Sequence, residues 1–390
     1  MTEADRARQD SRKTMMLEAP LPSVIARMAV PSIVSFLITS IYNLADTYFV
    51  SSLGTEATAA VSVNASLDQI IMMAGSMLAV GASSYIARLL GARRDEEASR
   101  TLSSAFFLAM GFGGILNCFL DPLFIFYLDM EVKGASIATA ISKLVSFAIL
   151  IFPYVTGRSV LRLSLRRCRP TGVILGQIAS VGSSSLFRNG LAVLSAIVLN
   201  NIAGGISDSA LAGIGVSTKV MMFPFGIILG FGTGFQPVAG FNWGAGRYDR
   251  VLESYRFSAR VAAAGAAAMG LALAVFAGPL IALFAEADPA MREIGALCIR
   301  LQCLALPVHS WVAVVNMLCA GLGQARGAVL LSTSRQGTCF LPIVYPVALL
   351  WGAVGVAAVQ AVADILSMTL AVPIIRKVKR QILAAQRSAP

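Results

Sequence analysis

Long apolar windows recur along the whole chain, and they constrain its fold more than any other feature. Many windows of about 20 residues contain at most one ionisable side chain, which is the length that an α-helix needs to cross the hydrocarbon core. These windows show no sustained two-residue alternation, so membrane-spanning strands are a poor explanation. Hydrophobic residues make up 57% of the chain and charged residues only 13%, against about 25% charged in a typical soluble domain. The sequence therefore predicts an all-α, polytopic transmembrane helix bundle.

We expect about ten spans, with both termini on the cytoplasmic side. The expected spans are 23–52, 57–89, 101–128, 132–156, 172–202, 208–241, 254–284, 288–321, 326–351 and 354–376. Lysine and arginine gather in every second connection, and the positive-inside rule places such connections in the cytoplasm. Residues 1–22 have no apolar h-region, so the first apolar run is predicted to be a retained span and not a cleaved signal.

The chain divides into two lobes that resemble each other. Residues 57–63 are similar to 210–216, and residues 91–95 are similar to 244–249 at the same spacing. This pattern predicts two parallel pseudo-repeat lobes of four plus six spans, with chance similarity between apolar segments as the alternative. The predicted organisation is a cytoplasmic N-terminal tail (1–22), a first transmembrane lobe (23–157), a basic cytoplasmic linker (158–171), a second transmembrane lobe (172–378) and a cytoplasmic C-terminal tail (379–390).

Charge and motif content argue against several other functions. The net charge of +11 invites a nucleic-acid hypothesis, but the basic residues lie in short segments between apolar runs. The six cysteines form no CxxC pair, and the one histidine, His309, cannot build a histidine-based metal site alone. The chain has no HExxH motif and no GxxxxGK[ST] phosphate loop. We therefore expect neither an enzyme nor direct ATP coupling, and no cofactor.

Oxygen-bearing side chains lie at one depth in three spans of the first lobe. Asp46 on the first span and Asp121 on the third each lie roughly 10 Å from the outer end of their helix. Asn117 precedes Asp121 by four positions and so shares its face, and Thr139 lies at a similar depth on the fourth span. An ionisable group at membrane depth is costly and points to function. We interpret these four residues as an ion-coupling site for H⁺ or Na⁺; structural hydrogen bonds are the alternative.

The second lobe carries its own polar groups at membrane depth. Asp364 lies near mid-span, where it is either a counter-charge or a substrate contact. Lys219 and Arg188 either pair inside the bundle or snorkel, or they contact substrate. Arg335 lies near a predicted cytoplasmic end, where we expect a solvated or headgroup-bound side chain.

Flexible apolar residues accompany these polar groups. Met221, Phe223 and Phe225 flank Pro224 and are candidates to line an adaptable substrate cavity together with Lys219 and Asp364. A lipid-facing or packed run is the alternative.

Several motifs resemble one known family. They comprise Gln236-Pro237-Val238-Ala239-Gly240-Phe241-Asn242-Trp243-Gly244-Ala245-Gly246-Arg247, Gly321-Leu322-Gly323-Gln324, Ser334-Arg335-Gln336-Gly337 and Leu120-Asp121-Pro122-Leu123-Phe124-Ile125-Phe126. From about residue 20 to 378 the chain resembles the multidrug and toxic-compound extrusion (MATE) family, in particular its bacterial MepA-like and DinF-like members. The resemblance implies a two-lobed antiporter that exports lipophilic organic cations in exchange for H⁺ or Na⁺. By motif position, it also implies the same ion site at Asp46, Asn117, Asp121 and Thr139.

The chain departs from that family in its first half. Family members have twelve helices in two six-helix lobes, whereas this first lobe has only four expected spans. The span 101–128 begins like the third family helix and ends like the fifth, with Gly111, Gly113 and Gly114 at the join. We expect a monomer in a bacterial inner membrane, with organic cations and membrane lipids as its partners. A flippase for a lipid-linked saccharide and a non-transporting remnant are the alternatives.

Overall fold

The computed structural model describes residues 14–51, 55–109, 170–282 and 288–388. Within these ranges, the side chains of residue 39 and residues 41–71 lie outside the description. Every regular element of the described chain is helical. The principal helices are α2 (Leu21–Ser51), α3 (Thr55–Gly91), α6 (Gly172–Ile206), α7 (Asp208–Gly244), α8 (Tyr248–Ala282), α9 (Pro289–Gly321), α10 (Ala325–Thr333) and α11 (Leu341–Ser388), with a π-helical segment, η2 (Ser334–Thr338), after α10.

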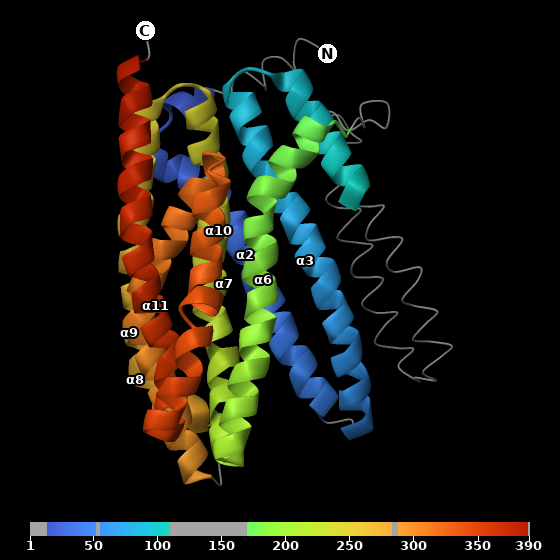
Figure 1. Ribbon diagram of the computed structural model, residues 1–390, viewed down its shortest axis with the longest axis vertical. Helices are drawn as coiled ribbons and strands as arrows, with labels where there is room; N and C mark the ends of the chain where they lie inside the picture. Colours follow the sequence, from blue (N-terminus) through green and yellow to red (C-terminus); the bar gives the residue numbers. More distant parts are fainter. Residues whose placement is uncertain (1–13, 52–54, 110–169, 283–287, 389–390) are drawn as a thin grey trace, which may run out of the picture.

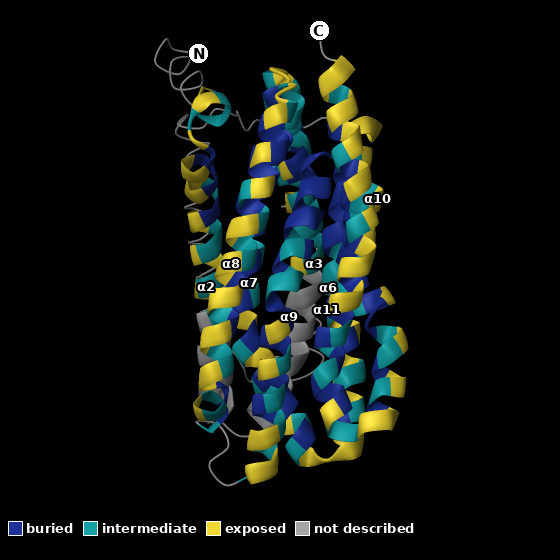
Figure 2. Ribbon diagram, turned by 90° about the vertical axis from the view of Figure 1, so that its left-hand side faces the viewer, coloured by how far each residue is buried: buried dark blue, intermediate teal, exposed yellow. Residues whose placement is uncertain are grey.

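The helices form an elongated bundle whose members run alternately up and down (Figure 1). Seven described helical segments are long and apolar enough to cross a membrane. Large apolar side chains such as Leu271, Leu304 and Leu350 are 70–76% exposed on the outside of the bundle. Eighteen of the 33 residues of α9 are buried, whereas the outer helices keep an exposed face (Figure 2). Such a surface requires lipid around it, and the multi-pass helical prediction is confirmed.

The bounds of α2, α3, α6, α7 and α9 lie close to the predicted spans, and α8 begins several residues earlier than predicted. The expected span 326–351 is not one continuous α-helix, because it comprises α10, η2 and the first arm of α11. Gly352 has φ 54°, a conformation that glycine adopts without strain, and it divides α11 into two arms. The second arm continues to Ser388, through most of the segment predicted as a C-terminal tail. Residues 110–156 of the two remaining first-lobe spans lie outside the described residues.

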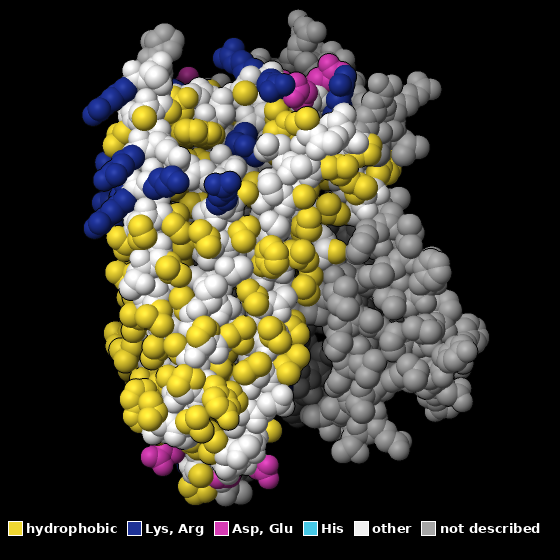
Figure 3. Space-filling model, viewed as in Figure 1, with side chains coloured by type: hydrophobic (Ala, Val, Ile, Leu, Met, Phe, Trp, Pro, Cys, Tyr) yellow, Lys and Arg dark blue, Asp and Glu magenta, His cyan; other side chains and the backbone are white. Residues whose placement is uncertain are grey.

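Basic side chains gather at one end of the bundle. Helix α2 begins and α11 ends there, and lysine and arginine side chains cluster around it (Figures 1 and 3). We call this the basic end and define it by Arg94, Arg247, Arg326, Arg376 and Lys379. The opposite end carries acidic side chains (Figure 3), and α7 begins at Asp208 and α9 is capped by Asp288. The charge asymmetry predicted from the sequence is therefore present in the fold.

Helices α3 and α7 cross at the basic end through two glycines. A Cβ atom added to Gly91 would meet the carbonyl oxygen of Phe241, and one added to Gly244 would meet the carbonyl oxygen of Arg88. One constant offset in residue number relates Gly91 to Gly244 and Arg88 to Phe241. The same offset relates the first and last residues of α3 to those of α7. We call this pair of approaches the reciprocal contact. It has the form that two duplicated lobes produce around a two-fold axis.

Further contacts between the two halves lie on the basic-end side of the bundle. The Ser84 hydroxyl donates a hydrogen bond to the carbonyl oxygen of Ala320, and Gln236 Nε2 donates one to Val80 O at 3.3 Å. Gly81 on α3 lies against the backbone of Ile178 on α6. Small residues allow membrane helices to approach so closely. The two halves are thus joined through this part of the described chain.

A helix cap at the opposite end gives a pH-dependent prediction. Asp288 caps α9 by accepting a hydrogen bond from the Met291 amide at 3.1 Å, and it accepts another from Ser209 Oγ at 2.6 Å. The Ser209 hydroxyl, followed by the Met291 amide, lowers the pKa of this carboxyl below its usual value. A lowered folded-state pKa stabilises the protein above the unfolded pKa, and that contribution is lost as the pH falls through the folded pKa. Asp288→Asn should therefore lower the thermal midpoint at pH 7 but not at the acid end of a pH series; a difference independent of pH would contradict this.

Candidate functional site

The ion-coupling residues predicted in the first lobe fall outside the described part of the structure. Asp46 belongs to α2, but its side chain is among those not described. Asn117, Asp121 and Thr139 lie within 110–169, which the structure does not describe. The four-residue site therefore stays a prediction, and the geometry available for a site comes from the second lobe.

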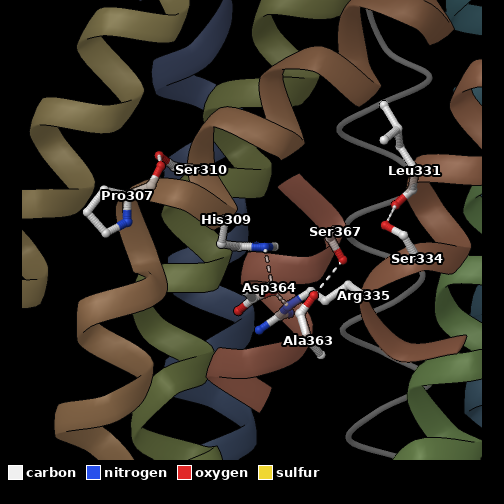
Figure 4. Close-up of polar contacts among 9 residues, drawn as sticks. All are labelled: Pro307, His309, Ser310, Leu331, Ser334, Arg335, Ala363, Asp364 and Ser367. Carbon is white, nitrogen blue, oxygen red and sulfur yellow. Dashed lines mark hydrogen bonds and ion pairs between the residues drawn. The ribbon is translucent and has the colours of Figure 1, made fainter. Parts of the chain in front are cut away.

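A buried ion pair lies in the second half of the chain. Arg335 Nε is 2.7 Å from Asp364 Oδ1, and the two side chains are 16% and 3% exposed (Figure 4). The pair joins η2 to the second arm of α11. Close, well-oriented pairing is what allows two charges to remain inside a bundle at membrane depth. Asp364 is thus a counter-charge, the first of the two roles left open by its sequence position.

The π-helical segment directs Arg335 towards this carboxylate. In η2 the amide of Cys339 donates to Ser334 O at 2.9 Å, five residues back instead of four. The additional residue in that turn changes the helical phase of the side chains, and such π-bulges are frequent at functional sites. The expectation of a solvated Arg335 at a helix end is wrong, because η2 turns its side chain inwards.

An imidazole and an aromatic ring complete the cluster. His309 Nδ1 on α9 lies 3.5 Å from the same Asp364 oxygen. The Arg335 guanidinium lies 4.1 Å from the centre of the Phe225 ring on α7, and that ring lies edge to face with His309 at 5.2 Å. Four elements therefore contribute one side chain each to what we call the Arg335 cluster: Arg335, Asp364, His309 and Phe225. The Phe225 ring holds the Arg335 guanidinium by cation–π attraction.

Arg188 adds a second guanidinium next to the cluster. It lies on α6, which packs against η2: Ser195 donates a hydrogen bond to Gln336 O, and Gly337 lies against Leu191. Arg188 donates to Ser185 Oγ at 3.0 Å and acts electrostatically on His309. Among the described residues, no carboxylate lies within ion-pair distance of it.

The structure brings together only two of the five residues predicted to contact substrate. Phe225 and Asp364 meet in the Arg335 cluster. Met221 is fully buried and packs in the core between α7, α8 and α9. Phe223 is 46% exposed, and Lys219 is also exposed. Met221 and Phe223 thus lie apart from the cluster although they are its neighbours in sequence.

A cavity of about 430 Å³ lies elsewhere, between α3, the helical residues 95–109 and α7. Its lining includes Leu78, Ile86, Phe106 and Phe241, and it contains no charged side chain. The charged side chains of the Arg335 cluster therefore do not line this apolar cavity.

The sequence contained a signal for the cluster. Arg335 lies in η2, just before the first arm of α11, and Asp364 lies in the second arm, so opposite charges occur on either side of Gly352. Charges placed in this way can meet across a helical hairpin. The sequence singles out His309 only as a possible metal ligand. Its position beside a buried carboxylate depends on the packing of α9 against α11, which no local pattern reveals.

Comparison with known proteins identifies a family model, sequence relatives and a solved structure that match this chain. A family model described as MatE matches residues 31–175 and again 185–345, one match in each half. The multidrug export protein MepA of Staphylococcus aureus (strain N315) is 23% identical over 413 residues, covering 87% of this chain and 90% of that protein. MepA of Staphylococcus haemolyticus (strain JCSC1435) is 21% identical over 440 residues, covering 95% of this chain and 97% of that protein. The crystal structure of MATE in complex with MaL6 matches with a TM-score of 0.85 and 20% identity, covering 96% of this chain and 99% of that one.

The alignment lengths show that this chain is shorter than a relative, which is relevant to the predicted shortening of the first lobe. An alignment over 440 residues is longer than the 390 residues of this chain, so the S. haemolyticus protein contains at least 50 residues without a counterpart here. This chain is therefore shorter than that relative, and the location of the missing residues in the first lobe stays a prediction.

Proposed function

The chain belongs to the MatE family, and we propose that it is a secondary active antiporter that exports lipophilic organic cations in exchange for H⁺ or Na⁺. The observation that carries this proposal is the reciprocal contact, because two similar lobes that close against each other at one end can rock so that this end opens as the opposite end closes, and a shared interior is then exposed alternately to the two sides. The names of the MepA relatives support multidrug export.

The protein acts in this proposal as a monomer in a bacterial inner membrane, with membrane lipids around it and no cofactor. Both termini are cytoplasmic, and the distribution of lysine and arginine supports this orientation (Figure 3). With the basic end in the cytoplasm, the contacts of Ser84, Gln236 and the reciprocal contact close the cytoplasmic side.

The coupling ion binds in the first lobe, at Asp46, Asn117, Asp121 and Thr139. Two carboxylates, an amide and a hydroxyl provide either a proton acceptor or the hard oxygen ligands that a small cation prefers. In the second lobe, the substrate binds beside the Arg335 cluster, in which Phe225 holds the Arg335 guanidinium against its ring and Asp364 neutralises the same guanidinium.

Efflux of a fluorescent lipophilic cation tests this function. Cells that express the intact chain should export rhodamine 123 faster than empty-vector cells, and Asp121→Asn or Asp46→Asn should reduce that export at least tenfold at equal expression. The reason is that a neutral amide cannot exchange a proton or hold Na⁺ with a charge. A protonophore and removal of Na⁺, applied separately, identify the coupling ion.

Asp208→Asn is the matched control, because Asp208 is exposed at the start of α7, in the second half of the chain. It should leave export unchanged. Export that continues at full rate in both first-lobe variants would place the ion site elsewhere. No export above the empty vector would argue against the antiporter.

A flippase for a lipid-linked saccharide is the second candidate. The observation in its favour is the excess of guanidinium groups over carboxylates around His309, since a cationic interior suits an anionic lipid headgroup. Absence of rhodamine 123 export together with movement of a lipid-linked saccharide in vesicles would favour it.

A further inference from the structure

Helices α10 and α11 pack against each other near the basic end and carry exposed cations there. A Cβ atom added to Gly327 on α10 would lie 3.4 Å from Ile374 Cγ2 on α11. Arg326 directly precedes Gly327, and Lys377 follows Ile374 by just under one helical turn. Both side chains are exposed, and lysine and arginine side chains gather over the upper parts of these two helices (Figures 1 and 3). Two cations on adjacent helices thus lie at nearly the same level.

A second contact between the same helices holds a third cation in place. Gln324 Nε2 donates a hydrogen bond to Gln381 Oε1 at 2.7 Å, which fixes the start of α10 against α11. Arg380, the residue before Gln381, is exposed. On the other side of α11, Val378 and Ile382 are 1% and 0% exposed and pack in the core. The basic residues are therefore carried by a docked helix and not by a free tail.

The helices that form this surface contain almost no acidic residues. From residue 294 to residue 390 the sequence has a single acidic side chain, Asp364, and its carboxylate is paired with the buried Arg335. α10 and the second arm of α11 therefore provide no carboxylate for the exposed cations at their surface. An anionic group from outside these helices is complementary to them.

The exposed surface becomes apolar with distance from the basic end. Leu330, about one turn after Arg326 on α10, is 55% exposed, and Leu370, about two turns before Lys377 on α11, is 41% exposed. A charged surface followed by an apolar one over a few turns matches a phospholipid, whose phosphate is followed by its acyl chains. A free phosphate ion would use only the charged part.

We propose that the α10–α11 face, which we define by Arg326, Leu330, Leu370, Lys377 and Arg380, binds a phospholipid with an anionic headgroup, such as phosphatidylglycerol, from the leaflet at the basic end. The basic side chains hold the phosphate, for which a guanidinium provides parallel N–H donors, and the two leucines contact an acyl chain. Basic surfaces on membrane helices bind anionic headgroups in this way. The site does not depend on what the protein exports.

Two fluorescent lipids test the site by binding alone. Phosphatidylglycerol and phosphatidylcholine, each labelled on an acyl chain, are titrated with the purified full-length chain in non-ionic detergent, and anisotropy gives each Kd. Arg326→Gln with Lys377→Gln should raise the Kd of phosphatidylglycerol at least tenfold, since each basic side chain near a membrane surface strengthens anionic-lipid binding about fivefold. The Kd of phosphatidylcholine, whose phosphate is balanced by its own choline, should change less than twofold, which also shows that the variant is folded.

Two matched double variants serve as controls. Arg256→Gln with Arg260→Gln removes the same net charge from exposed positions on α8 and should change neither Kd by more than twofold. Arg326→Lys with Lys377→Arg keeps both charges and should retain most of the phosphatidylglycerol affinity. The proposal is overturned if the α8 variant weakens phosphatidylglycerol binding as much, or if the α10–α11 variant affects both lipids equally or neither. Displacement of the labelled phosphatidylglycerol by millimolar inorganic phosphate would also overturn it, because the site would then bind a free anion.

Discussion

Gly244→Ala is expected to be more damaging than alanine at almost any other glycine of the second half. The new methyl group would occupy the position of the Arg88 carbonyl oxygen, which is part of the backbone and has no rotamer by which to move away. Helices α3 and α7 would have to separate at the basic end. Overpacking of this kind costs about 1–3 kcal/mol, and we expect rhodamine 123 export to fall at least tenfold because the contact that closes this end is lost.

Gly265→Ala is the control for this substitution. Gly265 lies in the interior of α8, and a Cβ atom there would meet nothing within 4 Å. Alanine should be neutral or slightly stabilising, since it is the better helix former. Thermal unfolding in detergent and export at equal expression are the two measurements. If Gly244→Ala lowers the thermal midpoint no more than Gly265→Ala does, helices α3 and α7 do not approach as described.

The symmetry of the contact gives a second, stricter test of the same substitution. Gly91→Ala should have an effect similar to that of Gly244→Ala, because each glycine lies against the carbonyl group that corresponds to the other's. The double variant should be clearly less destabilised than the sum of the two single variants, because one separation of the helices relieves both collisions. Additive effects would mean that the two approaches are independent.

The bounds of most helices could be predicted from hydropathy, because a span must be long and apolar wherever it lies in the bundle. The repeat of residues 91–95 in 244–249 could also be read from the sequence, and it marks the two glycines of the reciprocal contact. Their mutual approach could not, since it depends on the angle at which two distant helices cross. For the same reason the sequence indicated a relationship between the lobes without showing where they join.

Arg335 illustrates why the candidate site was harder to predict than the fold. Helical periodicity assigns a face to each residue only while the helix keeps 3.6 residues per turn. The π-helical turn Ser334–Thr338 changes the direction in which the following side chains point. A regular α-helix continued through this span therefore gives the wrong surroundings for Arg335. Asp364 lies in regular helix, and its two possible roles, counter-charge and substrate contact, were both foreseen. The position of Arg335 shows that Asp364 is a counter-charge.

Asp364→Leu is expected to destabilise the protein by about 3–5 kcal/mol, the usual result of removing one member of a buried ion pair. The substitution leaves Arg335 with the Phe225 face as its only attractive contact among those described, and its charge then has no counter-ion in the cluster. His309 also loses its acidic neighbour at 3.5 Å. Thermal unfolding in detergent at constant pH measures the loss.

The double variant Arg335→Leu with Asp364→Leu separates pairing from packing. Two apolar side chains of similar size need no counter-charge, and such replacements are often neutral or stabilising, so the double variant should recover most of the stability lost in Asp364→Leu. Asp249→Asn breaks the exposed Arg247–Asp249 pair instead and should cost less than about 1 kcal/mol. A double variant as unstable as Asp364→Leu would show that the carboxylate is held for a reason other than Arg335. A stable double variant that no longer exports rhodamine 123 would instead mean that the pair is retained for transport and does not stabilise the fold.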